Sequence, residues 1–98
     1  MKEDLNIENT KAKMHTAWDK VQTLPSQIYA ETLAHIAPKL PGLTPTEREV
    51  CVFIRHHFTS EEIAAVTYRS IKTIETHRKN IRRKLKGIRN LASFLEEL

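Results

Sequence analysis

Apolar residues recur every three or four positions through the second half of the chain, and a helix-start signal precedes each periodic stretch. Glu47 follows Thr44 by three residues, and Glu62 follows Thr59 by three; both pairs have the Thr-x-x-Glu form of a capping box. A serine and an asparagine, which also favour helix starts, precede two further stretches. The pattern predicts helices near residues 45–56, 60–67, 71–85 and 90–97, capped by Thr44, Thr59, Ser70 and Asn90.

Strand signals are weak in comparison. The one cluster of β-branched residues, at 50–54, lies inside the first of these capped helices. We therefore expect residues 43–98 to form an all-α domain of four helices. Gly87 follows the last periodic residue of the third helix and suits a left-handed C-terminal cap.

Residues 1–42 are expected to form a helical arm that ends in a short linker at 38–42. Pro25 interrupts the helical pattern, either by kinking one helix or by starting another. Two interpretations are open: the arm folds onto the domain, or its helices form a pair that mediates dimerisation. The apolar residues that define the helical face of the arm are Met14, Trp18, Val21, Ile28, Leu33 and Ile36.

The second and third predicted helices have the spacing of a helix-turn-helix motif. Such a pair needs a small residue in the first helix, a turn four residues later and a branched apolar residue about six positions beyond the turn. Ala64, Tyr68 and Ile74 have these offsets. The small side chains of Ala64 and Ala65 allow the two helices to approach closely.

Positive charge is concentrated in one segment, although the formal net charge is only +4. Residues 69–89 hold nine lysines and arginines and a single acid, Glu75. Such an excess produces a strong positive potential that attracts polyanions. A solvated basic helix has the same composition, so the charge alone does not establish nucleic-acid binding.

Rotation of the third helix at about 100° per residue separates a buried stripe from an exposed face. Ile81 and Leu85 fall within about 20° of Ile74 and define the buried stripe. The opposite side combines several donors with one carboxylate acceptor, a set that can read base edges and bind phosphates. The exposed residues are Lys72, Glu75, Thr76, Lys79, Asn80 and Arg83, with Thr73 on one shoulder.

Three motifs, in this order and spacing, resemble the LuxR/GerE-type helix-turn-helix DNA-binding domain, the C-terminal domain type of bacterial LuxR-family regulators. They are LTPTEREV at 43–50, EIA at 62–64 and TIETHRKNIRRKL at 73–85. The resemblance implies a four-helix domain whose third helix enters the major groove of double-stranded DNA. It implies dimerisation through the fourth helix, whose apolar residues are Leu91, Phe94, Leu95 and Leu98.

The resemblance also implies roles for single side chains. It implies base contacts for Glu75, Thr76 and Lys79. It implies contacts with the DNA backbone for Thr73, Asn80 and Arg83. Ser60 and Glu61, which open the scaffold helix, are expected near phosphates, because helix N-termini bind anions.

The chain departs from the family pattern at its turns. His57 stands where the family usually has glycine, and Tyr68 and Arg69 occupy the motif turn in place of a small residue. Residues 86–91 also differ from the usual glycine directly after Lys-Leu. These departures concern the turn geometry and the dimerisation helix rather than the fold.

No motif indicates an enzyme, a cofactor or a metal site. The chain has no nucleophile–base–orienter set and no glycine-rich phosphate loop. His56 and His57 are adjacent, so their side chains diverge by about 100° on a helix. Cys51 has apolar neighbours and is expected to be a small buried hydrophobe. A single cysteine and the absence of a signal-peptide pattern or an apolar span fit a cytoplasmic protein without a membrane segment.

The sequence thus predicts a sequence-specific, double-stranded-DNA-binding transcriptional regulator of bacterial type that acts as a homodimer. Two alternatives remain. One is a module similar to the promoter-recognition region of sigma factors, acting with RNA polymerase. The other is a protein-interaction or anti-regulator module. The chain is either free-standing or the C-terminal end of a longer regulator.

Overall fold

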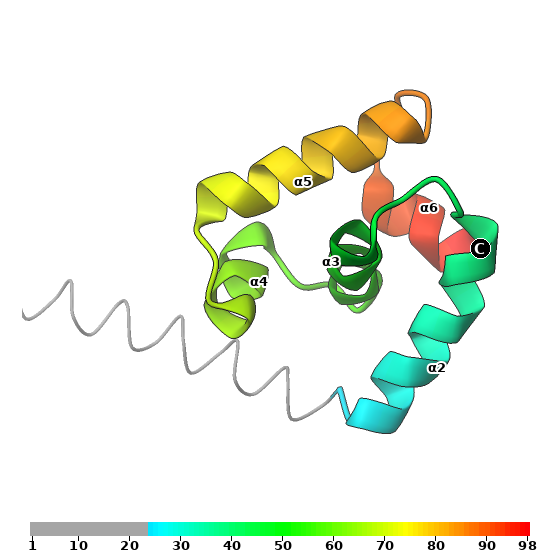
Figure 1. The fold of residues 1–98 in the computed structure, drawn as a ribbon, viewed down its shortest axis with the longest axis horizontal. Helices are drawn as coiled ribbons and strands as arrows, with labels where there is room; N and C mark the ends of the chain where they lie inside the picture. The colour runs from blue at the N-terminus through cyan, green and yellow to red at the C-terminus, as the bar shows by residue number, and fades with distance from the viewer. Residues whose placement is uncertain (1–23) are drawn as a thin grey trace, which may run out of the picture.

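A computed structural model describes residues 24–98, and the regular elements in this range are all helices (Figure 1). They are α2 (Ser26–Ile36), the 3-10 helix η1 (Ala37–Lys39), α3 (Pro45–Arg55), α4 (Ser60–Thr67), α5 (Ile71–Lys84) and α6 (Leu91–Glu97). The last four agree with the predicted helices to within one residue, and the all-α fold is confirmed. The helical face predicted from Met14, Trp18 and Val21 lies outside the described residues.

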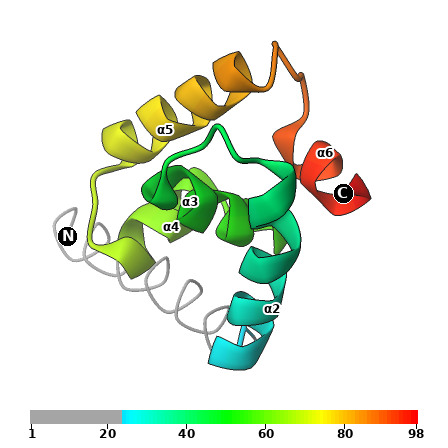
Figure 2. The same ribbon diagram turned by 45° about the vertical axis from the view of Figure 1, so that its right-hand side comes forward.

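Helix α3 is the central element, and α2, α5 and α6 all pack against it (Figures 1 and 2). Val50, Val52 and Ile54 are buried on several sides of α3, because neighbouring helices surround it. This explains why a β-branched cluster is compatible with a helix at this position. The largest fully buried side chains are Ile36, Ile54, Ile63, Ile74, Ile81, Leu91, Leu95, Val50, Val52 and Cys51.

The segment ahead of α3 belongs to the same core. Leu24, Ile36 and Leu40 are buried together with the core residues of the later helices. Thr32 is also buried, and its Oγ1 lies 2.9 Å from Nε2 of His56 at the end of α3. The described part of the arm therefore packs on the domain. The segment expected to be a linker, 38–42, joins η1 to α3, and Leu40 within it buries its side chain in the core.

Two capping boxes start α3 and α4, as the sequence predicts. Glu47 N donates to Thr44 Oγ1 at 3.1 Å, and Thr44 N donates to Glu47 Oε1 at 2.8 Å. The corresponding pair of hydrogen bonds at α4 joins Thr59 and Glu62 at 2.9 and 3.2 Å. Each cap satisfies backbone N–H groups that have no partner within the helix, and is worth about 1 kcal/mol.

Three helices end at a non-glycine residue in the left-handed conformation: His57, Tyr68 and Lys86 have φ of 67°, 57° and 64°. After α3, Phe58 N donates to Phe53 O at 3.0 Å, and the two rings pack with centroids 5.1 Å apart. This combination is a Schellman motif with its hydrophobic contact. The turns where glycine is missing therefore keep a glycine-like backbone, at a cost of about 1–2 kcal/mol per residue. Gly87 also has a positive φ, 79°, as predicted.

A buried carboxylate joins the start of α3 to the end of α5. Glu47 Oε1 accepts a hydrogen bond from Lys84 Nζ at 2.6 Å, and the side chain of Glu47 is only 4% exposed. Burial alone raises the pKa of Glu47, but hydrogen bonds from Lys84 and Thr44 outweigh burial, and the net pKa is lowered. Glu47 is thus a structural residue that holds two helices together.

We expect Glu47→Gln to lower the free energy of unfolding at pH 7 by about 1.5–3 kcal/mol, because glutamine retains the capping box but loses the charge opposite Lys84. A lowered pKa in the folded state means that this stabilisation is present above the unfolded pKa, about 4.3, and disappears as pH falls through the folded pKa. Urea denaturation between pH 7 and pH 3 measures the difference. Glu97→Gln, on the exposed side of α6, is the control. A wild-type advantage that did not change with pH would contradict the ion pair.

Candidate nucleic-acid interface

The turn between α4 and α5 has the geometry that the spacing of Ala64, Tyr68 and Ile74 predicts. Ala64 is 6% exposed and Ile74 is fully buried, so the small residue lies where the two helices pack. Tyr68 ends α4 in the left-handed conformation. Ser70 Oγ then starts α5 by accepting a hydrogen bond from Thr73 N at 3.1 Å. The pair α4–α5 is a helix-turn-helix.

The two sides of α5 differ sharply in exposure. Ile74 and Ile81 are fully buried, and Leu85 is half-buried at the end of the same stripe. The predicted reading residues are on the opposite side. The exposed members are Lys72, Thr73, Glu75, Thr76, Lys79 and Arg83, and Asn80 is half-buried. We call Lys72, Glu75, Thr76, Lys79 and Arg83 the polar face of α5.

Some hydroxyl groups near this face are already engaged. Thr76 Oγ1 donates to Lys72 O at 3.0 Å, so its proton is used within the helix while its lone pairs and methyl group face solvent. Thr73 Oγ1 lies 2.8 Å from Ser70 Oγ, within the N-terminal cap. Thr76 is therefore suited to accept a hydrogen bond or make an apolar contact, but not to donate to a base.

The basic residues of segment 69–89 differ in whether a carboxylate partner is available to them. Lys84 is paired with Glu47, and Arg69 Nη1 lies 3.7 Å from Glu49 Oε1, so both hold α5 and its turn to α3. Within residues 24–98, Lys72, Lys79 and Arg83 have no carboxylate partner. The cations of the polar face are thus free to bind an anion, and Lys86 and Arg89, which follow α5, are exposed as well.

A second pair of cations lies beside the buried stripe. Arg78 and Arg82 are half-buried. Burial lowers the pKa of Arg78, and repulsion from Arg82 lowers it further, although an arginine stays charged at neutral pH. Arg82 Nε is buried without a hydrogen-bond partner among the described residues. A phosphate near this shoulder would relieve the repulsion between the two guanidinium groups.

Ser60 is the first residue of α4 and is half-buried, next to the Thr59 cap. Glu61 is exposed beside it, whereas Glu62 is buried in the capping box. The N-terminus of α4 is the positive end of a helix dipole, which attracts anions. Two acidic side chains already lie in the first turn of α4. This arrangement weakens the case for Ser60 as a strong phosphate contact.

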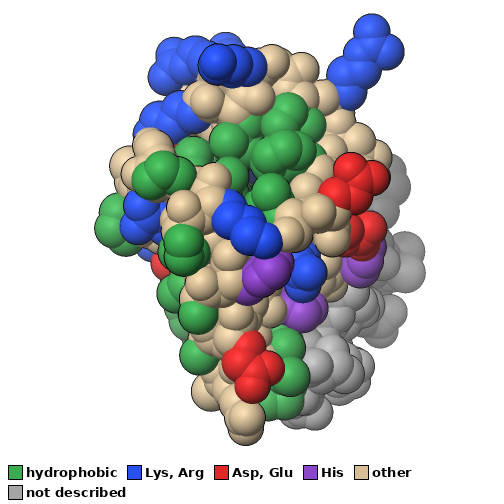
Figure 3. Space-filling view, turned by 90° about the vertical axis from the view of Figure 1, so that its right-hand side faces the viewer, with side chains coloured by type: hydrophobic (Ala, Val, Ile, Leu, Met, Phe, Trp, Pro, Cys, Tyr) green, Lys and Arg blue, Asp and Glu red, His purple; other side chains and the backbone are tan. Residues whose placement is uncertain are grey.

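The predicted dimerisation residues occupy two different environments. Leu91 and Leu95 are 2% and 0% exposed, because α6 packs against α3, so these two side chains are core residues and not surface contacts. Phe94 and Leu98 are half-buried at the outer side of α6. Figure 3 views the side of the molecule where α2 and α6 lie, and shows hydrophobic patches interrupted by basic and histidine side chains. Of the four predicted residues, only Phe94 and Leu98 therefore keep part of their apolar surface exposed.

The structure exposes two hydrophobic residues near the start of α5, and the sequence analysis did not single out one of them, Ile71. Tyr68 is 93% exposed at the turn, and Ile71 is 48% exposed at the first position of α5. Ile71 falls about 60° from Ile74 on the helical wheel, which places it at the edge of the expected buried stripe. Periodicity alone assigns such a residue to the core. In the described part of the chain, Ile71 instead lies outside the core and keeps about half of its surface exposed.

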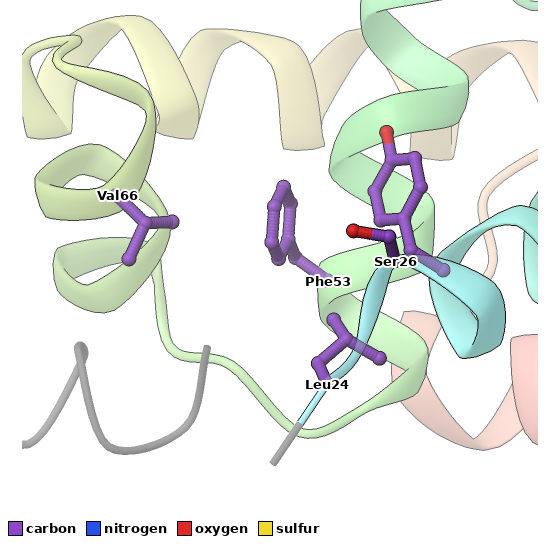
Figure 4. Close-up of a pocket in the computed structure, with 5 residues that line it drawn as sticks. Leu24, Ser26, Phe53 and Val66 are labelled. Atoms are coloured by element: carbon purple, nitrogen blue, oxygen red, sulfur yellow. The ribbon is translucent and has the colours of Figure 1, made fainter. Parts of the chain in front are cut away.

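A cavity of about 250 Å³ lies between α2, α3 and α4 (Figure 4). Val66 comes from α4, Phe53 from α3, and Leu24, Ser26 and Tyr29 come from the start of the described chain. Burial and the charge of Glu49 raise the pKa of Tyr29, which is therefore neutral at pH 7. The lining is mainly apolar and does not include the polar face. No three metal-binding side chains come together within residues 24–98.

The helix-turn-helix, supported by two further helices and presenting a basic polar face, defines a class of protein: a DNA-binding domain. The family model described as bacterial regulatory proteins, LuxR family (GerE), matches residues 41–93, more than half of the chain. The chain therefore belongs to this family, whose members regulate transcription by binding DNA. No curated protein and no solved structure gives a significant match. Among the described residues, no helix is both long and apolar enough to cross a membrane.

We expect Tyr68→Gly to raise the free energy of unfolding by up to about 1 kcal/mol, because glycine adopts the left-handed conformation without a steric penalty. The Tyr68 ring is almost entirely exposed, so its removal forfeits little packing. Tyr68→Ala is the matched control, since it removes the ring but keeps the strain. Thermal denaturation of both variants separates the two effects. Equal stability of the glycine and alanine variants would show that the backbone at Tyr68 is not strained.

Proposed function

We propose that this chain is a sequence-specific, double-stranded-DNA-binding transcriptional regulator and that α5 is its recognition helix, lying in the major groove. The observation that carries the proposal is the polar face of α5, which is exposed opposite a fully buried stripe. The major groove of B-DNA is about 12 Å wide and admits one α-helix. Helix α5 is fixed at both ends, by the Ser70 cap and by the Lys84–Glu47 ion pair, so its face is presented in one orientation.

Three side chains of the polar face have the chemistry of base recognition. Lys79 can donate to O6 and N7 of guanine, and the Glu75 carboxylate can accept from N4 of cytosine. Thr76 offers a methyl group and acceptor lone pairs, because its proton is donated to Lys72 O. We assign sequence discrimination to these three residues.

The remaining predicted contacts concern the DNA backbone. Lys72 and Arg83 are exposed and lack a carboxylate partner in the described chain, and we assign them to phosphates. Thr73 and Asn80 lie on the shoulder of the helix, where phosphate and sugar contacts position the protein without reading sequence. Ser60 takes a minor part, because Glu61 and Glu62 share its end of α4.

We further propose that the protein acts in the cytoplasm, without catalytic activity, as a homodimer on a two-fold symmetric site. Phe94 and Leu98 would contribute to the dimer contact, with Leu91 and Leu95 behind them in the core. The decisive experiment is selection of bound fragments from random double-stranded DNA. A palindromic consensus would support both base reading and dimeric binding, since half-site symmetry mirrors protein symmetry.

The alternatives give different results in the same experiment. Binding that requires RNA polymerase would favour the module similar to the promoter-recognition region of sigma factors. A stable complex with another protein, without salt-dependent DNA binding, would favour the interaction or anti-regulator module. Either outcome would overturn direct recognition of DNA by the chain alone.

We expect Lys79→Ala to lose about 1–3 kcal/mol of discrimination at one base position of the selected site, because a base contact carries sequence information. Arg83→Ala should instead weaken binding to all sequences and reduce the slope of log K against log salt by about 1. Fluorescence anisotropy at several salt concentrations measures both effects. Lys39→Ala, which removes the same charge at η1, is the control. Unchanged affinity and preference in Lys79→Ala would refute the assigned orientation of α5.

A further inference from the structure

Large exposed hydrophobic side chains are few in the described chain, and they are unevenly placed. Tyr68, Ile71 and Ile28 are 93%, 48% and 39% exposed. Ile28 lies on α2, whereas Tyr68 and Ile71 lie three residues apart at the N-terminal end of α5. The exposure of Ile71 leaves apolar surface in water at the end of the helix that the proposed function places in DNA.

Ile71 continues the polar face instead of the buried stripe. Ile71, Glu75 and Lys79 are spaced by four residues, so they lie one above another on successive turns of α5. All three are exposed. A recognition helix contacts base edges mainly with its N-terminal residues, and Ile71 is the first residue of α5. Its position is therefore that of a base contact.

The chemistry of an isoleucine side chain narrows what it can recognise. It has no donor or acceptor, and contact with the amino, carbonyl or N7 groups of a base edge would remove their water without replacing the hydrogen bonds. The one apolar group that a base pair presents in the major groove is the C5-methyl of thymine. Phosphates and sugars offer no comparable methyl group at the floor of the groove.

We propose that Ile71 reads a thymine by contact with its C5-methyl group, at the edge of the site read by Glu75, Thr76 and Lys79. This inference rests on the proposed function. It adds one base, thymine, that the apolar side chain at the start of α5 selects. Tyr68 adds a second apolar surface at this end of α5. The polar face and Ile71 together specify a mixed site: hydrogen bonds select some positions, and a methyl contact selects thymine at another.

The test combines removal of a methyl group from the DNA with truncation of Ile71. Each thymine in the selected site is replaced in turn by deoxyuridine, which lacks only the C5-methyl group. The dissociation constants of wild type, Ile71→Val and Ile71→Ala are then measured on each duplex. For wild type we expect an approximately fourfold loss of affinity at one position, the effect of one buried methyl group. For Ile71→Ala the loss at that position should fall below about twofold, with Ile71→Val intermediate.

Ile28→Ala is the matched control, because it removes an exposed isoleucine of similar accessibility on α2. It should retain the full wild-type sensitivity to deoxyuridine. Thermal denaturation should show Ile71→Ala to be folded, since Ile71 lies outside the core.

Two negative outcomes are distinguishable. Equal sensitivity of wild type and Ile71→Ala to every deoxyuridine, with tight and sequence-specific binding, would overturn the thymine contact and leave the recognition helix in place. Failure of the wild-type protein to bind any duplex would overturn the proposed function itself.

Discussion

Burial of Ile74 and Ile81 is the constraint on which the rest of the interface depends. These two residues lie on one stripe of α5 and belong to the core built around α3 and α4. Full burial of an isoleucine contributes roughly 1.5–3 kcal/mol, so rotation of α5 about its axis would be costly. The stripe therefore decides which side chains of α5 meet solvent. Every base or phosphate contact that we assign to α5 follows from that rotation.

Polar contacts at the two ends of α5 hold the helix in the orientation that burial of the apolar stripe gives it. Ser70 holds the first turn, and Lys84 reaches back to the buried carboxylate of Glu47. Glu47 serves the α3 capping box and the ion pair with the same oxygen, so one side chain couples the start of α3 to the end of α5. A recognition helix that is held in place before binding loses less entropy when it enters a groove.

At three turns, the residue present does not favour the backbone conformation that it adopts. His57, Tyr68 and Lys86 adopt a conformation that glycine would adopt at lower cost. At His57 the neighbouring packing of Phe53 on Phe58 compensates, since it secures the Schellman turn. At Tyr68 the ring is exposed and provides no such packing. Backbone strain without compensating packing is found most often at functional sites, and Tyr68 adjoins the helix that we propose for DNA recognition.

The amino-acid sequence by itself determined the four helices of the domain, their caps and the orientation of α5, because these depend on local hydrogen bonds and on a periodicity of 3.6 residues. The capping boxes at Thr44 and Thr59 and the buried Ile74 stripe are examples. Tertiary structure alone decided the partners that lie far apart in the chain. It paired Glu47 with Lys84, buried the Leu40 side chain of the segment between η1 and α3, and put Leu91 and Leu95 behind the surface of α6. It also left Ile71 about half exposed, although the helical wheel places it at the edge of the buried stripe. Periodicity shows which side of a helix faces the protein. Only the packing of neighbouring elements decides how much of that side is buried.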